Sequence, residues 1–277
     1  MKLRMILRTI VLRTIARNTF GIFLRDKLLI VFGALFVCVI LMMMTPLLTS
    51  RARTTVSNME GMQTYVLGMV SATMYVVSGA GSLLAAWAGA DAVATEMKSG
   101  TILAVMARPV KRWEFLLGKY LGVLLLMACY VVMMFGLSYL LAWMGGQRVS
   151  AASWVLLTYP MVRYAIYAAI AMAVATLLHP VLSWVFTLLL GVAAMMVVPS
   201  EEPIVNAASR WLSTGLYYLL PSTQFLSEDR FLNIKQATLR QTGWAEHFLT
   251  LTYGVDYALV VLLLAMWSFH YRSLKRD

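Results

Sequence analysis

The sequence predicts an all-α membrane protein of six transmembrane helices. Its composition is 61% hydrophobic and 13% charged, with a mean hydropathy of +0.78, whereas soluble domains are about 45–50% apolar and 25% charged. Long runs without charge recur along the chain, and a membrane-spanning helix needs about 20 such residues. These runs and their connections use most of the 277 residues. We therefore expect a single transmembrane domain, 1–277, with no soluble catalytic domain.

The first predicted element is an N-terminal helix over residues 1–27. Leu3, Ile6, Leu7 and Ile10 recur at helical spacing, while basic residues occupy the other faces. This pattern is typical of an amphipathic helix in the inner headgroup layer, although a charged topogenic tail would give a similar sequence. The segment is too polar for a signal-peptide core, so we expect it to be retained.

Six apolar runs predict the membrane spans. They lie at about 28–48, 65–90, 115–143, 156–178, 181–198 and 253–271. His179-Pro180 predicts a tight turn between the fourth and fifth spans. Residues 199–252 form the longest polar stretch, and within it WLSTGLYYLLP mixes aromatic residues with leucines. We expect a short extracytoplasmic helical segment there, lying in the interface before the sixth span.

The distribution of basic residues predicts the orientation. On an alternating six-span path, the side with both termini carries 15 of the 23 Lys and Arg residues and the opposite side carries 7. Cytoplasmic loops are enriched in Lys and Arg, so both termini are expected in the cytoplasm. The net charge of +11 is therefore interpreted as topology and contact with anionic lipid, not as a nucleic-acid surface.

The connection between spans two and three, residues 91–112, is the most informative segment. Helix-forming residues run through Glu96, Ser99-Gly100 interrupts them, and Thr101 can cap a second short apolar helix that Pro109 ends. A short apolar helix between charged flanks suits a groove on a cytoplasmic partner. The residues thus predict a docking segment on the inner face.

This segment resembles the corresponding loop in the membrane subunits, or permeases, of type-2 ABC exporters. The matching residues are Glu96, Gly100-Thr101, Arg108-Pro109-Val110, Arg112 and Gly118-Lys119. The six-span layout, the N-terminal helix and the long outer segment extend the resemblance over nearly the whole chain.

The resemblance implies an ABC transporter permease that works in export from the bacterial inner membrane. Its partners would be a cytoplasmic ABC ATPase in two copies, which holds ATP and Mg, and a second permease copy in a homodimer or heterodimer. The coupling helix would dock on the ATPase through Glu96, Gly100, Thr101, Ile102, Leu103, Met106, Arg108, Pro109 and Arg112. Arg108, Lys111 and Arg112 are equally explained as positive-inside anchors. The substrate is not identified by the sequence.

Catalytic motifs are missing from the sequence, so we expect no enzyme. A Walker A loop requires GxxxxGK[ST], but Gly118-Lys119 is followed by Tyr120 and preceded at the required spacing by Trp113. The three histidines are scattered, so no metal site is expected. The 20 methionines raise the possibility of a copper path, but flexible apolar filling explains them better.

Two charged residues in or near spans are candidates for substrate binding, Arg163 and Asp256. Arg163 lies in the fourth run close to Pro160, where snorkelling to the headgroups is the alternative explanation. Asp256 lies at the predicted outer start of span six. Small residues also recur every four positions at Gly81, Ala85 and Gly89 and at Ala165, Ala169 and Ala173, which favours close helix packing, preferentially within the chain.

Two other functions remain open. A permease-like mechanotransmitter would act on an envelope partner through residues 199–252 without moving a substrate. An ion-driven secondary transporter would need charged residues or broken helices near the midplane, and the sequence shows neither clearly.

Overall fold

The computed structural model describes residues 2–51, 59–99, 111–144, 157–196, 220–221, 226, 232–233, 238–239 and 244–271. In these ranges the chain is helical apart from one small strand pair and short connections. The helices are α1 (Lys2–Leu24), α2 (Lys27–Arg51), α3 (Met59–Ser99), α5 (Arg112–Met144), α6 (Thr158–Ala175), α7 (Pro180–Met196) and α9 (Trp244–Tyr271). The helical class predicted from the sequence is therefore confirmed.

The strand pair lies in the predicted outer segment. Strands β1 (Leu232–Asn233) and β2 (Thr238–Leu239) pair antiparallel. The sequence did not predict them, because two residues per strand are too short to produce an alternating pattern. The helical segment predicted from WLSTGLYYLLP falls almost entirely outside the described residues.

Three helices of the described chain contain apolar windows long enough to cross a membrane. These windows are Tyr75–Ala94, Arg112–Leu140 and Ala245–Phe269, and Pro180–Ala194 is a shorter apolar helix. A hydrocarbon core of about 30 Å requires about 20 helical residues. The structure thus supports a membrane-embedded helical protein, while the number of six spans stays a prediction.

Several helices extend beyond the predicted spans. Helix α3 continues to Ser99, past the predicted span end at residue 90, and α9 begins at Trp244 instead of residue 253. Hydropathy locates the apolar part of a helix, but the backbone hydrogen bonds of a helix continue into polar sequence. Residues 244–252, which the sequence assigns to the extracytoplasmic segment, are therefore helical and continuous with the rest of α9.

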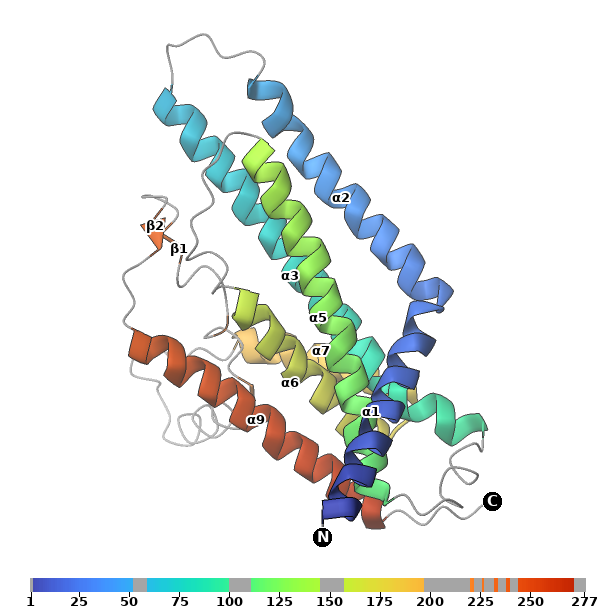
Figure 1. Ribbon diagram of the computed structural model, residues 1–277. Helices are drawn as coiled ribbons and strands as arrows, with labels where there is room; N and C mark the ends of the chain where they lie inside the picture. The colour runs from blue at the N-terminus through green and yellow to red at the C-terminus, as the bar shows by residue number, and fades with distance from the viewer. Residues whose placement is uncertain are drawn as a thin grey trace.

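Helix α3 is at the centre of the bundle. It packs against α2, α5, α6 and α7, and α6 in turn packs against α9 (Figure 1). Helix α1 packs along α5. We call the end of the bundle where α3 ends and α5 begins the inner end, and the end where α6 and α9 begin the outer end. The predicted orientation places the inner end in the cytoplasm.

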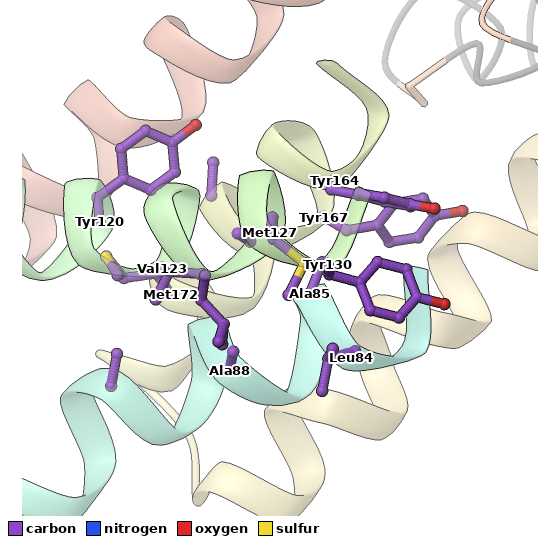
Figure 2. Packing of buried hydrophobic residues seen from close by; sticks show 14 of the residues in the cluster. Leu84, Ala85, Ala88, Tyr120, Val123, Met127, Tyr130, Tyr164, Tyr167 and Met172 are labelled. Carbon is purple, nitrogen blue, oxygen red and sulfur yellow. The ribbon is translucent and has the colours of Figure 1, made fainter. Parts of the chain in front are cut away.

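The core joins α3, α5 and α6 through small and aromatic side chains. Figure 2 shows Ala85 and Ala88 of α3 facing Met127 of α5 and Met172 of α6. All four side chains are fully buried. Alanines let two helix backbones approach, and the longer methionines fill the remaining space.

Helix α1 contacts the bundle with its second half. Thr19 and Phe23, one turn apart, are buried, and the ring of Phe23 packs edge-on against Trp87 of α3 with ring centroids 5.7 Å apart. Arg13 and Arg17 are exposed. Helix formation in the N-terminal segment agrees with the sequence prediction, and its position at a membrane surface stays a prediction.

The turn predicted at His179-Pro180 is present. Helix α6 ends at Ala175, the amide of Leu178 donates to the carbonyl oxygen of Val174, and α7 begins with Pro180. Proline suits the first position of a helix, because its missing N–H would have no partner there and its φ is already helical. The short connection holds α6 and α7 together as neighbours.

Candidate functional site

The predicted docking segment is described at its two flanks. Glu96 lies in the last described turn of α3, whose bounds are Met59–Ser99, so the interruption predicted at Ser99-Gly100 stays a prediction. Residues 100–110 lie outside the described residues; they include the predicted docking residues Gly100, Thr101, Ile102, Leu103, Met106, Arg108 and Pro109. The next described residue is Lys111. A displacement of this segment would therefore act on α3 at one flank and on α5 at the other.

The start of α5 is fixed by a capping interaction. The backbone N–H of Lys111 donates to Oε2 of Glu114 at 3.2 Å. Glu114 is buried, whereas the side chain of Lys111 is exposed. A glutamate at the third helical position that accepts from the residue before the helix is one half of a capping box. This interaction explains why α5 begins at Arg112, before the apolar run at residue 115.

Arg112 ties the start of α5 to the end of α9. Its Nη1 donates to the carbonyl oxygen of Phe269 at 3.4 Å, where a cation is favourable because the last carbonyls of a helix carry partial negative charge. The rings of Phe115 and Phe269 stack beside this contact with centroids 6.4 Å apart. Arg112, the last of the predicted docking residues, is thus attached to the last helix of the chain.

Two glycines of α5 make room for α1. A Cβ on Gly118 would lie 2.8 Å from the side chain of Ile15, and one on Gly122 would lie 2.6 Å from Cβ of Thr19 and 2.8 Å from the carbonyl oxygen of Ala16. Gly118-Lys119 matches a family motif in the sequence, and the spacing Gly118-x-x-x-Gly122 is in addition a helix-packing motif that had not been predicted to matter. This four-residue spacing was the feature of the sequence that could have predicted the close contact between α5 and another helix.

Lys119 is buried within the same region. Its Nζ lies 5.7 Å from the centroid of the Phe115 ring, an arrangement in which a cation is attracted by the aromatic face. Arg112, Glu114 and Lys119 thus place three charged side chains near the start of α5. Each of them contacts another group of the protein.

The small-residue stripes pack α3 against α6 within the chain. A Cβ on Gly89 would lie 2.5 Å from the carbonyl oxygen and 2.9 Å from Cα of Ala168, so only a glycine fits. Gly81 likewise faces the ring of Tyr164. This confirms intramolecular packing for the α3 stripe, which the sequence analysis favoured over packing between subunits.

Tyrosine hydroxyls reinforce the contacts among α3, α5 and α6. Each donates to a backbone carbonyl oxygen of another helix: Tyr130 to Val77 (2.8 Å), Tyr164 to Ser78 (3.3 Å) and Tyr120 to Ala165 (3.0 Å). The rings of Tyr130 and Tyr164 meet edge to face with centroids 6.0 Å apart, and Figure 2 shows them beside Tyr167. Buried hydroxyls that find such acceptors hold helices in one register.

The outer end contains the two charged candidates, and the structure does not bring them together. Arg163 of α6 is buried. Asp256 is exposed and lies about three turns into α9, and its position at the outer start of span six stays a prediction. Near the first turns of both helices, the Tyr159 hydroxyl and Nδ1 of His247 make a hydrogen bond.

Metal-binding groups of three or more His, Cys, Asp or Glu side chains do not occur among the residues that the structure describes. The two cysteines are free: Cys38 is exposed and Cys129 is partly buried. The described part of the molecule is therefore a helical membrane protein whose charged side chains gather where α5 begins, beside the predicted docking segment.

The comparison with protein families agrees with this description. The family model described as ABC-2 family transporter protein matches residues 13–274. The chain belongs to this family and is a membrane-embedded ABC transporter permease subunit. Permeases of this family normally work with an ABC ATPase partner. No curated protein matches the chain.

Proposed function

We propose that this chain is the permease subunit of an ATP-driven exporter, which works as a dimer of permeases with two cytoplasmic ATPase subunits. The match to the ABC-2 family over residues 13–274 carries the proposal. The sequence has no Walker A loop, so the ATP and Mg are assigned to the partner. We also propose a location in the bacterial inner membrane with both termini in the cytoplasm, which the excess of Lys and Arg on that side of the predicted path supports.

The ATPase is proposed to dock on the coupling helix within residues 96–106. Ile102, Leu103 and Met106 would supply its apolar face, while Glu96 and Arg108 would contribute charges at its flanks. Thr101 would cap this helix, Gly100 would allow the bend before it, and Pro109 would end it.

The contacts at the inner end support a route for the motion. A displacement of the docking segment acts on the end of α3 and the start of α5. Helix α3 is locked to α6 at Gly89 and Ala168, and α5 is tied to α9 through Arg112 and Phe269. Because packed helices move as units and not by gradual deformation, closure of the ATPase would shift these helices together.

Capture of the ATPase tests the docking step. The full-length permease is co-expressed with a tagged ATPase from the neighbouring gene and purified through the tag. We expect Ile102→Glu and Leu103→Glu to abolish co-purification, because a charge on the apolar face cannot be desolvated in the groove. Arg13→Ala, an exposed change on α1, is the control and retains it. If ATPase capture survives deletion of residues 96–106, the docking assignment is wrong.

A further inference from the structure

Arg163 is a buried cation without a hydrogen-bond partner at two of its nitrogens. The residue is 8% exposed, and its Nε and Nη2 atoms are buried and make no hydrogen bond. A buried charge is costly unless it is paired and hydrogen-bonded. Snorkelling, the alternative explanation for this residue, would place the guanidinium in water. The structure shows the opposite.

The neighbouring positions on α6 show which helices Arg163 faces. Tyr159 and Tyr167 lie one turn before and one turn after it on the same face of α6. Tyr159 bonds to His247 of α9, while a Cβ on Gly191 of α7 would collide with the Tyr167 hydroxyl. Arg163 therefore lies between α7 and α9. Since helical side chains lean toward the helix N-terminus, it is directed toward the outer end.

The acids of α9 do not neutralise Arg163. Glu246 and Asp256 are both exposed. Gly254 and Ala258 form the stripe of α9 that faces the chain, since Gly254 contacts Val162 and both are buried. Asp256 lies between these two positions in sequence and so points to the other side of the helix. Within the described chain, the positive charge of Arg163 is thus left without a counter-charge.

We propose that Arg163 binds an oxyanion, a carboxylate or a phosphate, during the transport cycle. A guanidinium presents a planar fork of donors that matches the two oxygens of such a group, and two of the three nitrogens here have their donors unused. The bound anion would restore the hydrogen bonds and the charge balance that the protein does not supply. This proposal rests on the function as an exporter and adds that the cargo, or a lipid that accompanies it, carries a negative group.

Ligand-dependent thermal stability tests the proposal. The full-length permease is placed in phosphatidylcholine nanodiscs, and its unfolding midpoint is followed by tryptophan fluorescence during titration with hexanoate, hexanol or hexylammonium. These probes share an apolar tail and differ in charge. We expect only hexanoate to raise the midpoint. In Arg163→Met the half-saturating hexanoate concentration should rise at least about tenfold, because a charge-assisted pair is lost.

The same variant separates anion binding from a structural ion pair. Removing a buried charge that has no partner should leave the midpoint without hexanoate unchanged or higher. If Arg163→Met instead lowers the midpoint or fails to fold, Arg163 is part of an internal pair and the proposal is wrong. It is also wrong if wild type does not respond to hexanoate or the variant responds equally well. Arg163→Lys should retain a weaker response, and Arg17→Met, which removes an exposed positive charge, should respond as wild type does.

Lipid composition distinguishes the two sources of the anion. If nanodiscs with phosphatidylglycerol raise the midpoint of wild type but not of Arg163→Met, and suppress the hexanoate response, the group is a headgroup phosphate. If the hexanoate response is unchanged, the group belongs to the cargo; both results support oxyanion binding. ATPase capture does not depend on hexanoate. A failed hexanoate test therefore leaves the docking proposal standing, and a failed capture test does not decide whether Arg163 binds an anion.

Discussion

The inner and outer ends of the bundle treat their charges in opposite ways. At the inner end, Arg112 donates to the Phe269 carbonyl, and Glu114 caps the helix that Arg112 begins. At the outer end, Arg163 is buried with two nitrogens that make no hydrogen bond. A satisfied network holds its helices in one arrangement, whereas an unsatisfied buried charge keeps a capacity to bind. The difference suggests that the inner end transmits motion and the outer end recognises a ligand.

The largest effect on this comparison should come from Gly89→Ala, which separates α3 from α6. The new Cβ would meet backbone atoms of Ala168 at 2.5 and 2.9 Å, and backbone cannot move aside as a flexible side chain can. We expect a loss of about 1–3 kcal/mol in the free energy of unfolding, the usual cost of overpacking.

Denaturation with SDS in mixed micelles measures this loss. Gly79→Ala is the matched control, because it lies in the same helix and its Cβ would have no atom within 4 Å. Equal stability of the two variants would show that α3 and α6 are not locked together.

A smaller effect is expected for Arg112→Ala, which cuts the tie between α5 and α9. The lost hydrogen bond is long, at 3.4 Å, and partly exposed, so the expected destabilisation is about 1 kcal/mol. ATPase capture should persist, while stimulation of ATP hydrolysis by the permease in reconstituted complexes should fall several-fold.

Lys111→Ala is the control, since it removes an exposed neighbouring charge and leaves the backbone bond to Glu114 intact. If both variants reduce ATP hydrolysis alike, the general positive charge matters and the tie to α9 does not.

The smallest effect is expected for Tyr159→Phe at the outer end. It removes the hydrogen bond to His247 and should cost about 0.6 kcal/mol, as interhelical hydrogen bonds in membranes typically do. Differential SDS denaturation of wild type and the Phe variant measures it, with Tyr164→Phe, whose hydroxyl donates to Ser78 of α3, as a comparison in the core. A loss of several kcal/mol would place a rigid network at the outer end and remove the contrast between the two ends.

The order of the helices was accessible from the sequence. Hydropathy located the apolar parts of the long helices, and Pro180 marked a helix start that the structure reproduces. These signals are local, so they do not require knowledge of the neighbours. The family resemblance drawn from the loop at residues 96–119 was confirmed by the family match.

The candidate site depended on contacts that the sequence does not encode locally. The burial of Arg163 follows from its position between α7 and α9, and a hydropathy profile treats buried and lipid-facing positions of a helix alike. The hydrogen bond from Arg112 to Phe269 depends on the packing of α5 against α9, which are far apart in the sequence. The spacing of Gly118 and Gly122 could have predicted close packing against another helix. It could not have predicted that this helix is α1.

Helix α3 runs unbroken from Met59 to Ser99, 41 residues, which corresponds to a rod of about 60 Å, twice the thickness of a hydrocarbon core. Such a rod works as a lever. If it pivots by about 5° at the end next to the docking segment, its far tip travels about 5 Å, nearly one helical turn. A slight rocking in the cytoplasm would then be amplified into a sizeable sweep at the opposite membrane surface.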